Sequence, residues 1–209
     1  FTKQGIYTVF IFDQWSNYGK HFTQLDGSRA LPRRIFVMDK YVREMLVASG
    51  IDGSIVRIVG HPGIESEVKK VSEINNAKKD VLRRSLEVGK NEKVILLVLE
   101  PLLKDFGRGT LHYDEYAITR SVVDALDKNM AEEAKLFVRL HPRQIRREFC
   151  DFLRLEALSE RVQLCPDKMT ETESLAIADV VIGIHSVFLA KAAASGKPII
   201  CLQFNPKDL

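Results

Sequence analysis

The feature that most constrains the fold is a regular alternation of apolar runs and amphipathic segments over residues 94–209. The apolar runs have the length and composition of buried strands. The segments between them carry apolar residues at helical spacing. We expect strands at 94–99, 135–140, 161–165, 179–184 and 197–203, and helices at 114–129, 146–158, 170–178 and 187–195. Strands that alternate with helices pair in parallel, so this part is predicted to be an α/β domain with a doubly wound parallel sheet.

The first part of the chain shows the same alternation on a smaller scale. We expect strands at 5–13, 34–39 and 54–60, and a helix that Asp39 caps and Gly50 ends. Residues 64–93 are highly charged, with apolar residues at roughly helical spacing, which predicts one or two surface helices. The predicted parts are therefore 1–65, a connecting segment 66–93, and 94–209. Because the opening residues resemble the middle of a folded unit, we expect a further N-terminal portion to precede them.

Composition excludes several classes of protein. A net charge of only +3 gives no support for binding nucleic acid. No run approaches the eighteen apolar residues of a membrane span. The three cysteines lack CxxC spacing, which argues against a disulfide framework or a zinc cluster and favours a reducing, cytoplasmic setting.

Ligands of doubly wound sheets bind at the carboxyl ends of the strands, where the strand order reverses. Ser186 lies in the loop after the strand at 179–184 and stands immediately before a run of helix formers, so we expect it to be an N-cap with its hydroxyl turned outward. The unpaired amides at such a helix terminus bind phosphate. His185 would add a second donor. The alternative is a serine-capped helix with no ligand.

Two further loops are predicted to reach the same edge. The loop HPRQ offers His141 and Arg143 as donors for a phosphate, and Pro142 stiffens it. A structural histidine is the alternative for His141. The loop at 100–113 carries Glu100, Asp105, two glycines, His112 and Tyr113. Long loops at this edge are often functional, although this one is also compatible with a disordered segment.

Other chemistries find no support in the sequence. The five histidines show neither HxH nor HxxxH spacing, and no Walker A loop or GxSxG elbow is present. We therefore expect no metal and no bound cofactor.

Taken together, the strings VGHPGIE, LHPR and ADVVIGIHSVFLAKAAASGKPII resemble the GT-B superfamily. This group includes glycosyltransferases, UDP-N-acetylglucosamine 2-epimerases, CDP-glycerol glycerophosphotransferases and polysialyltransferase-like enzymes. The resemblance implies two Rossmann-like domains, the nucleotide being held mainly by the C-terminal one. Residues 1–62 would then be the end of the N-terminal domain.

The resemblance also implies roles for particular residues. His141 and Pro142 match the HP element of CMP- and CDP-using members, in which the histidine contacts the donor phosphate. Ser186 matches a phosphate-contacting serine, and residues 196–198 match the structural end of that motif. Ala190 and Lys191 stand where many members have a ribose-binding acid, and Glu100 and Glu173 are the alternative candidates for that role. Val187 and Phe188 replace the doubled glycine of the 2-epimerases, which argues against epimerase activity.

The resemblance implies that the catalytic base comes from the N-terminal domain. Asp13 would then be the base candidate, with Trp15 and Asn17 beside the acceptor; a plain turn is the alternative. The expected function is transfer of a sugar or glycerol-phosphate group from a CMP-, CDP- or UDP-activated donor to a glycan or lipid-linked precursor of a cell-surface polysaccharide. A lipid-linked acceptor would bring the protein to the membrane periphery. The alternatives are a nucleotide-sugar 2-epimerase and a non-catalytic nucleotide-binding module.

Overall fold

The computed structural model describes residues 5–13, 15, 16, 18, 20–111, 113–129 and 134–202. The chain divides into two compact units, 1–65 and 66–209. The expected segment 66–93 falls within the second unit, where its residues Val71, Ile74, Leu86 and Val88 join the core.

The first unit is a three-stranded parallel sheet in the order β1-β2-β3, formed by Val9–Ile11, Arg34–Val37 and Val56–Ile58. Helix α1 (Lys40–Ala48) and the single turns η2 (Lys20–Phe22) and η3 (Gly53–Ile55) complete it. The predicted cap is confirmed: the Asp39 side chain accepts a hydrogen bond of 2.8 Å from the Val42 amide. Gly50, with φ of +85°, follows the helix as expected.

The predicted strand at 5–13 is too long. Only Val9–Ile11 pairs, because β1 lies at the sheet edge with a single neighbour, and Gly5 adopts φ of +74° in a turn. The predicted surface helices are two, α2 (Pro62–Glu73) and α3 (Asn76–Ser85). Helix α2 begins at Pro62, where a missing N–H costs nothing, and the His61 Nδ1 atom accepts from the Ile64 amide.

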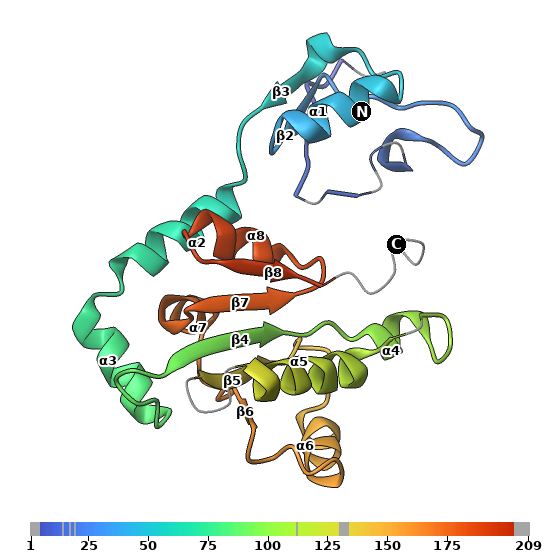
Figure 1. Cartoon of the computed structure of the whole chain (residues 1–209). Helices are drawn as coiled ribbons and strands as arrows, with labels where there is room; N and C mark the ends of the chain where they lie inside the picture. The colour runs from blue at the N-terminus through green and yellow to red at the C-terminus, as the bar shows by residue number, and fades with distance from the viewer. Residues whose placement is uncertain are drawn as a thin grey trace. The chain divides into compact units, whose positions relative to one another are not determined.

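The second unit confirms the doubly wound parallel sheet (Figure 1). Its five strands lie in the order β6-β5-β4-β7-β8 and all pair in parallel. They are β4 (Lys93–Val98), β5 (Ala134–Arg139), β6 (Val162–Leu164), β7 (Val180–Gly183) and β8 (Ile199–Cys201). The helices are α4 (Leu102–Phe106), α5 (Glu115–Asn129), α6 (Arg146–Leu155), α7 (Glu171–Ile177) and α8 (Val187–Ala194).

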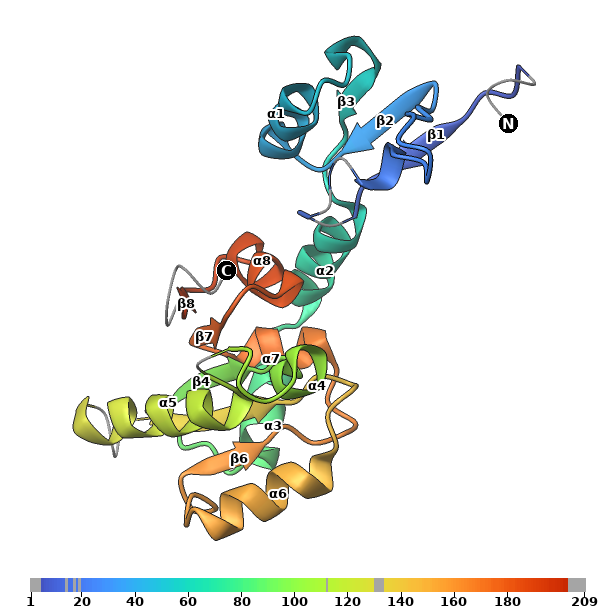
Figure 2. The ribbon, with the colours of Figure 1, turned by 90° about the vertical axis from the view of Figure 1, so that its right-hand side faces the viewer.

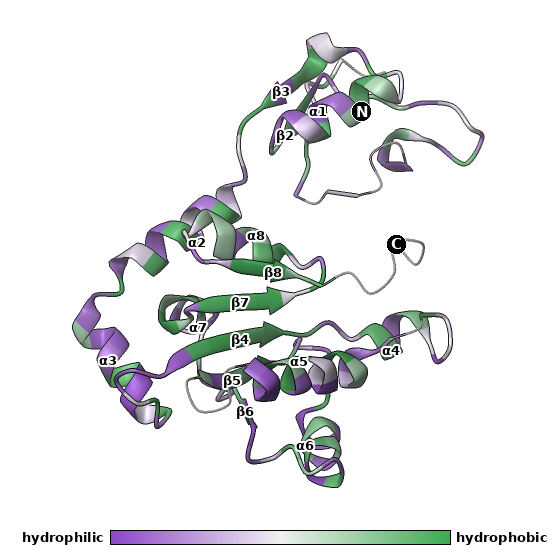
Figure 3. Cartoon of the chain, viewed as in Figure 1, coloured by the Kyte–Doolittle hydropathy of each residue, from purple (hydrophilic) through white to green (hydrophobic). Residues whose placement is uncertain are grey.

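Both faces of this sheet are covered, as β4 illustrates. Val94, Leu96 and Val98 pack on the face that carries α7 and α8. The alternate residues Ile95, Leu97 and Leu99 pack on the face that carries α5 and α6. The hydropathy colouring shows β4, β7 and β8 as mainly apolar and α3 as mainly polar (Figure 3). Among the described residues, no helix combines the length and hydrophobicity that a membrane span requires.

One expectation for this unit is wrong in detail. The stretch after β4 was expected to be an open loop, yet Leu102–Phe106 forms the short helix α4. Leu102 is only 2% exposed and anchors this helix on the core below α5. A single buried residue in a five-residue helix leaves no periodic pattern to read in the sequence.

Candidate functional site

The strand order places a topological switch point between β4 and β7. From β4 the chain builds outward through β5 and β6 on one side, and later through β7 and β8 on the other. The chain therefore continues in opposite directions after β4 and β7, and the carboxyl ends of these two strands are where ligands of such sheets bind. Figure 2 looks onto this edge and shows α4 in front of the sheet.

A carboxylate and a histidine meet at this switch point. Glu100 follows β4 and His185 follows β7, and Glu100 Oε2 lies 3.3 Å from His185 Nε2. The Glu100 side chain is 18% exposed and that of His185 is 55% exposed. The structure thus brings together two predicted site residues that are 85 positions apart.

Ser186 is the N-cap of α8, as predicted. Its Oγ accepts a hydrogen bond of 3.2 Å from the Phe188 amide. The hydroxyl oxygen is thus engaged with its own helix, which differs from the expected outward orientation, while the O–H proton can still be donated.

The start of α8 is fixed by close packing against β7. Phe188, Leu189 and Ala192 are buried beneath the helix. A Cβ atom on Gly183 would lie 3.3 Å from the Leu189 side chain. Glycine at this position therefore lets the helix terminus approach the sheet edge.

His141 lies after β5, on the other side of β4. Its Nδ1 atom accepts a hydrogen bond of 3.1 Å from the Arg143 amide. A neutral imidazole that accepts at Nδ1 carries its proton on Nε2, so the loop orients His141 as an Nε2–H donor.

Arg143 makes an ion pair that the sequence did not predict. Its two terminal nitrogens lie 2.5 and 2.6 Å from the two carboxylate oxygens of Asp105 in α4. The hydrogen bonds from Arg143 hold the pKa of Asp105 below its ordinary value. A guanidinium has five N–H donors, so this pair leaves donors for a further anion.

A buried network makes a second connection between the same two loops. Glu115 is 5% exposed and accepts from the Leu103 amide (2.9 Å) and from Gln144 Nε2 (3.4 Å). Gln144 Oε1 in turn accepts from the His141 amide at 2.8 Å. Glu115 and Gln144 thus position the loops after β4 and β5, and sequence reasoning missed both. An acidic residue at an expected helix start was the available signal, but it is equally typical of an exposed first turn.

The remaining predicted residues lie outside this constellation. Glu173 forms the capping box of α7 with Thr170 and pairs with Lys78 at 3.4 Å, so its carboxylate is already engaged. Lys197 donates to the Ala176 and Ala178 carbonyls, which caps the end of α7. Burial is the main cause that lowers the pKa of Lys197. This bonding gives the Gly-Lys-Pro sequence a structural role.

Asp13 belongs to the first unit. It is exposed, and its backbone carbonyl lies 3.2 Å from His61 Nε2. Trp15 stacks on the His61 ring at 5.6 Å and donates to Asp39. Asn17 and His112 lie outside the described residues. Within the described ranges, no group of three or more acidic, histidine or cysteine side chains is arranged to hold a metal ion.

Comparison with known proteins gives the class of fold. No protein-family model matches the sequence, and no curated protein sequence matches it. Solved structures do match, at 13–16% identity, so the likeness shows the fold. The chain therefore has a GT-B-like, Rossmann-type α/β fold, as the sequence resemblance implied.

Three of these structures illustrate the likeness. UDP-GlcNAc 2-epimerase from Neisseria meningitidis, bound to UDP-GlcNAc, matches with a TM-score of 0.68 and 16% identity over 99% of this chain and 56% of that chain. HepE from Anabaena, in complex with UDP-glucose, has a TM-score of 0.56 and 13% identity over 92% of this chain and 52% of the HepE chain. The wall teichoic acid polymerase TagF has a TM-score of 0.53 and 16% identity over 84% of this chain and 40% of the TagF chain. The chain thus spans 40% to 56% of the length of these three structures.

Proposed function

We propose that this chain is part of a glycosyltransferase-like enzyme that uses a nucleotide-activated donor of the CMP, CDP or UDP type. It would transfer a sugar or glycerol-phosphate group to a glycan or lipid-linked precursor of a cell-surface polysaccharide. The observation that carries the proposal is the switch point of the second unit, where Glu100 and His185 lie 3.3 Å apart and the next residue, Ser186, caps α8. Solved structures of this fold in complex with UDP-GlcNAc and UDP-glucose support it.

In this proposal the nucleotide phosphates bind at the start of α8. The helix terminus and the Ser186 hydroxyl would donate to the phosphate nearest β7. His141 Nε2–H and the remaining donors of Arg143 would approach from the loop after β5. Donors fixed before the reaction stabilise the negative charge that develops on the departing phosphate, so the transfer needs no metal or cofactor.

We assign the ribose hydroxyls to Glu100. Glu173 is engaged in the capping box, and Ala190 and Lys191 offer no carboxylate. The His185 imidazole holds Glu100 at the switch point, where a carboxylate can accept from hydroxyl groups. We propose Asp13 of the first unit as the base that activates the acceptor. The cytoplasmic setting expected from the cysteines stays a prediction.

A nucleotide-sugar 2-epimerase is the second candidate, favoured by the TM-score of 0.68 to an enzyme of that kind. The residues at the start of α8 weigh against it. Phe188 is only 6% exposed and anchors the helix in the core. The 2-epimerases have a doubled glycine after the serine, whereas this chain has Val187 and the buried ring of Phe188 there. Incubation with UDP-GlcNAc, followed by proton NMR, tests this candidate, because inversion at C2 of the sugar gives a distinct anomeric signal.

A thermal-shift screen with CMP, CDP, UDP and GDP tests the nucleotide site. A nucleotide at about a hundred times its dissociation constant should stabilise the chain by roughly 2.7 kcal/mol. The shift should disappear in the Ser186→Ala, His141→Ala double variant. Asn75→Ala is the matched control, because Asn75 caps α3 in the same manner, away from the site. Absence of a shift with every nucleotide would refute both the transferase and the epimerase, and a shift that survives the double variant would refute the site.

A further inference from the structure

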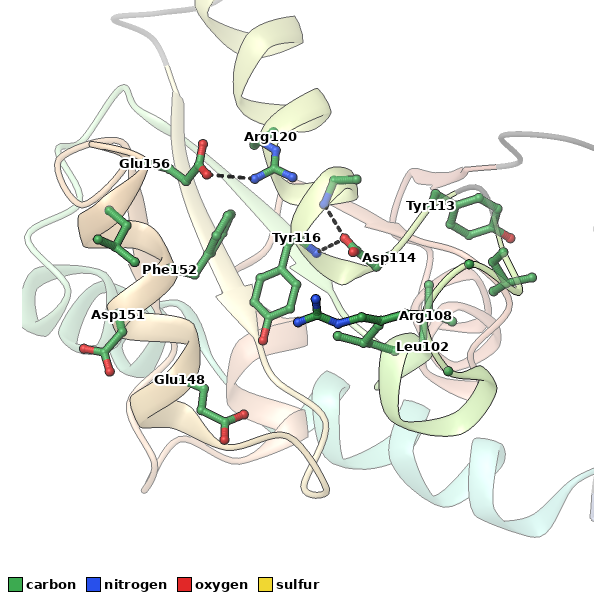
Figure 4. A pocket seen from close by; sticks show the side chains of 16 residues that line it. Leu102, Arg108, Tyr113, Asp114, Tyr116, Arg120, Glu148, Asp151, Phe152 and Glu156 are labelled. Carbon is green, nitrogen blue, oxygen red and sulfur yellow. Dashed lines mark hydrogen bonds and ion pairs between the residues drawn. The ribbon is translucent and has the colours of Figure 1, made fainter.

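A cavity lies in the second unit, apart from the candidate phosphate site. It has a volume of about 810 Å³ and opens between residues 107–111 and 113–117, which follow α4, and one side of α6 (Figure 4). Neither His141, His185 nor Ser186 lines it. Leu102 and Leu103 of α4 do line it, while Asp105 of the same short helix pairs with Arg143. Helix α4 thus borders both the cavity and the candidate phosphate site.

An aromatic cluster forms one wall of this cavity. The ring of Tyr116 lies 4.8 Å from that of Phe152 in an edge-to-face arrangement and is stacked at 5.7 Å on Phe149. Burial, the largest cause, raises the pKa of Tyr116, which keeps its phenol protonated as a hydrogen-bond donor. The Arg120 guanidinium lies over Phe152 at 5.4 Å and pairs with Glu156 at 3.1 Å, so this part of the wall is fixed.

Polar groups face each other across the aromatic wall. Glu148 and Asp151 project from α6, and Arg108 extends from the opposite loop toward Tyr116 (Figure 4). Asp151 pairs with Arg154, and Asp114 is occupied in capping the first turn of α5. Glu148 and Arg108, in contrast, make no ion pair or side-chain hydrogen bond with another described residue. The cavity therefore presents one acceptor and one donor that the protein itself does not use.

The charges and the shape select one class of ligand. The charged residues of the lining are two arginines and four carboxylates: Arg108, Arg120, Asp114, Glu148, Asp151 and Glu156. The excess of negative charge repels a polyanion such as a nucleotide. An aromatic ring flanked by carboxylates suits a sugar, whose C–H face packs on the ring while its hydroxyls donate to the carboxylates. The volume lies in the range of small-molecule sites.

We propose that this cavity binds an uncharged saccharide segment, the acceptor glycan of the transferase, with Glu148 and Arg108 contacting its hydroxyls beside the Tyr116 ring. The role as acceptor site rests on the proposed function, whereas saccharide binding does not. The acceptor would then be held in part by the unit that carries the candidate donor site.

An oligosaccharide array, followed by titration calorimetry with the saccharide bound best, tests this proposal on the full chain. We expect binding of neutral saccharides that Glu148→Gln and Arg108→Ala each weaken by roughly tenfold or more, because each loses a charge-assisted hydrogen bond. Both positions are exposed on the cavity wall, so folding should be kept. Glu160→Gln, an exposed glutamate outside the lining, is the matched control and should leave binding unchanged.

The nucleotide thermal shift, measured on the same variants, separates this proposal from the proposed function. It should be unchanged in Glu148→Gln and Arg108→Ala. Failure of the wild-type chain to bind any neutral saccharide, or binding that both substitutions leave intact, would overturn the saccharide site even if nucleotides bind. Saccharide binding that depends on Glu148 and Arg108, without any nucleotide shift, would support the cavity and refute the donor site.

Discussion

Asp105 connects two segments that border the candidate site, helix α4 and the loop after β5. It lies in α4 and forms a bidentate ion pair with Arg143 in the loop after β5, 38 positions away. The hydrogen bonds from Arg143 favour the ionised carboxylate, and nearby His141 and Lys104 act in the same direction. The pair thereby holds the His141 loop against α4.

The titration of Asp105 should follow from this pair. Its pKa in the folded chain lies below 3.8, its ordinary value, so the stabilising effect is complete above pH 3.8 and is lost as the pH falls through the lower folded pKa. Carbon NMR of the Asp105 carboxyl group should show the depressed pKa, and Arg143→Ala should return it toward 3.8. An unshifted pKa in the wild-type chain would mean that the ion pair does not form in solution.

The cysteines make a second prediction at this scale. Cys165 is buried, and desolvation raises the pKa of its thiol to about 11, whereas Cys201 is exposed. Because the thiolate is the reactive form, iodoacetamide near neutral pH should modify Cys201 and spare Cys165 in the folded chain. Mass spectrometry of peptides checks this. Equal modification of the two cysteines without denaturant would contradict the burial of Cys165 at the end of β6.

Individual residues differed in how far the sequence could place them. Ser186 was predictable as a cap because the signal is local: a serine directly before helix formers. The pairing of Arg143 with Asp105, and of Glu100 with His185, depends on which strands are neighbours. Local patterns do not contain that information, so these partners appeared only with the strand order.

At the scale of elements, the approach of α8 to β7 decides where the helix terminus lies. Gly183 leaves room for Leu189, and a Cβ atom there would meet the Leu189 side chain at 3.3 Å. Gly183→Ala should displace the start of α8 and lower the free energy of unfolding by about 1 to 3 kcal/mol. Urea denaturation measures this loss. The nucleotide thermal shift should fall as well, and an unchanged shift would show that the exact position of α8 does not matter for binding.

Glu115 connects two loops that define the candidate site. Its buried carboxylate accepts from the Leu103 amide and from Gln144. Glu115→Ala would leave these donors unpaired and should cost about 1 to 3 kcal/mol in the free energy of unfolding. Hydrogen exchange should also accelerate at the start of α4. Glu160→Ala, on an exposed loop, is the control, and equal effects of the two substitutions would contradict the proposed connection.

The elements themselves were largely predictable. Every strand of the second unit was expected within a few residues. The central strands β4, β5 and β7 are largely buried and therefore read as continuous apolar runs. The edge strand β1 was predicted too long and α4 was missed, since neither has a buried pattern along its full length. Partly exposed or very short elements depend on tertiary contacts that sequence periodicity does not record.

At the scale of the whole molecule, two parallel α/β units follow one another along the chain. The alternation of strands and helices predicted the doubly wound sheet of the second unit, and handedness rules then fix its ligand edge. We propose that this edge holds the phosphate or diphosphate of a nucleotide. The phosphates are assigned to the start of α8 and to the loop after β5.

A crystal structure of the full chain in complex with CDP or UDP tests this claim most directly. We expect a phosphate within hydrogen-bonding distance of Ser186 Oγ and the first amides of α8, with His141 Nε2 on the same diphosphate. A diphosphate bound elsewhere on the chain, with the start of α8 empty, would contradict the claim.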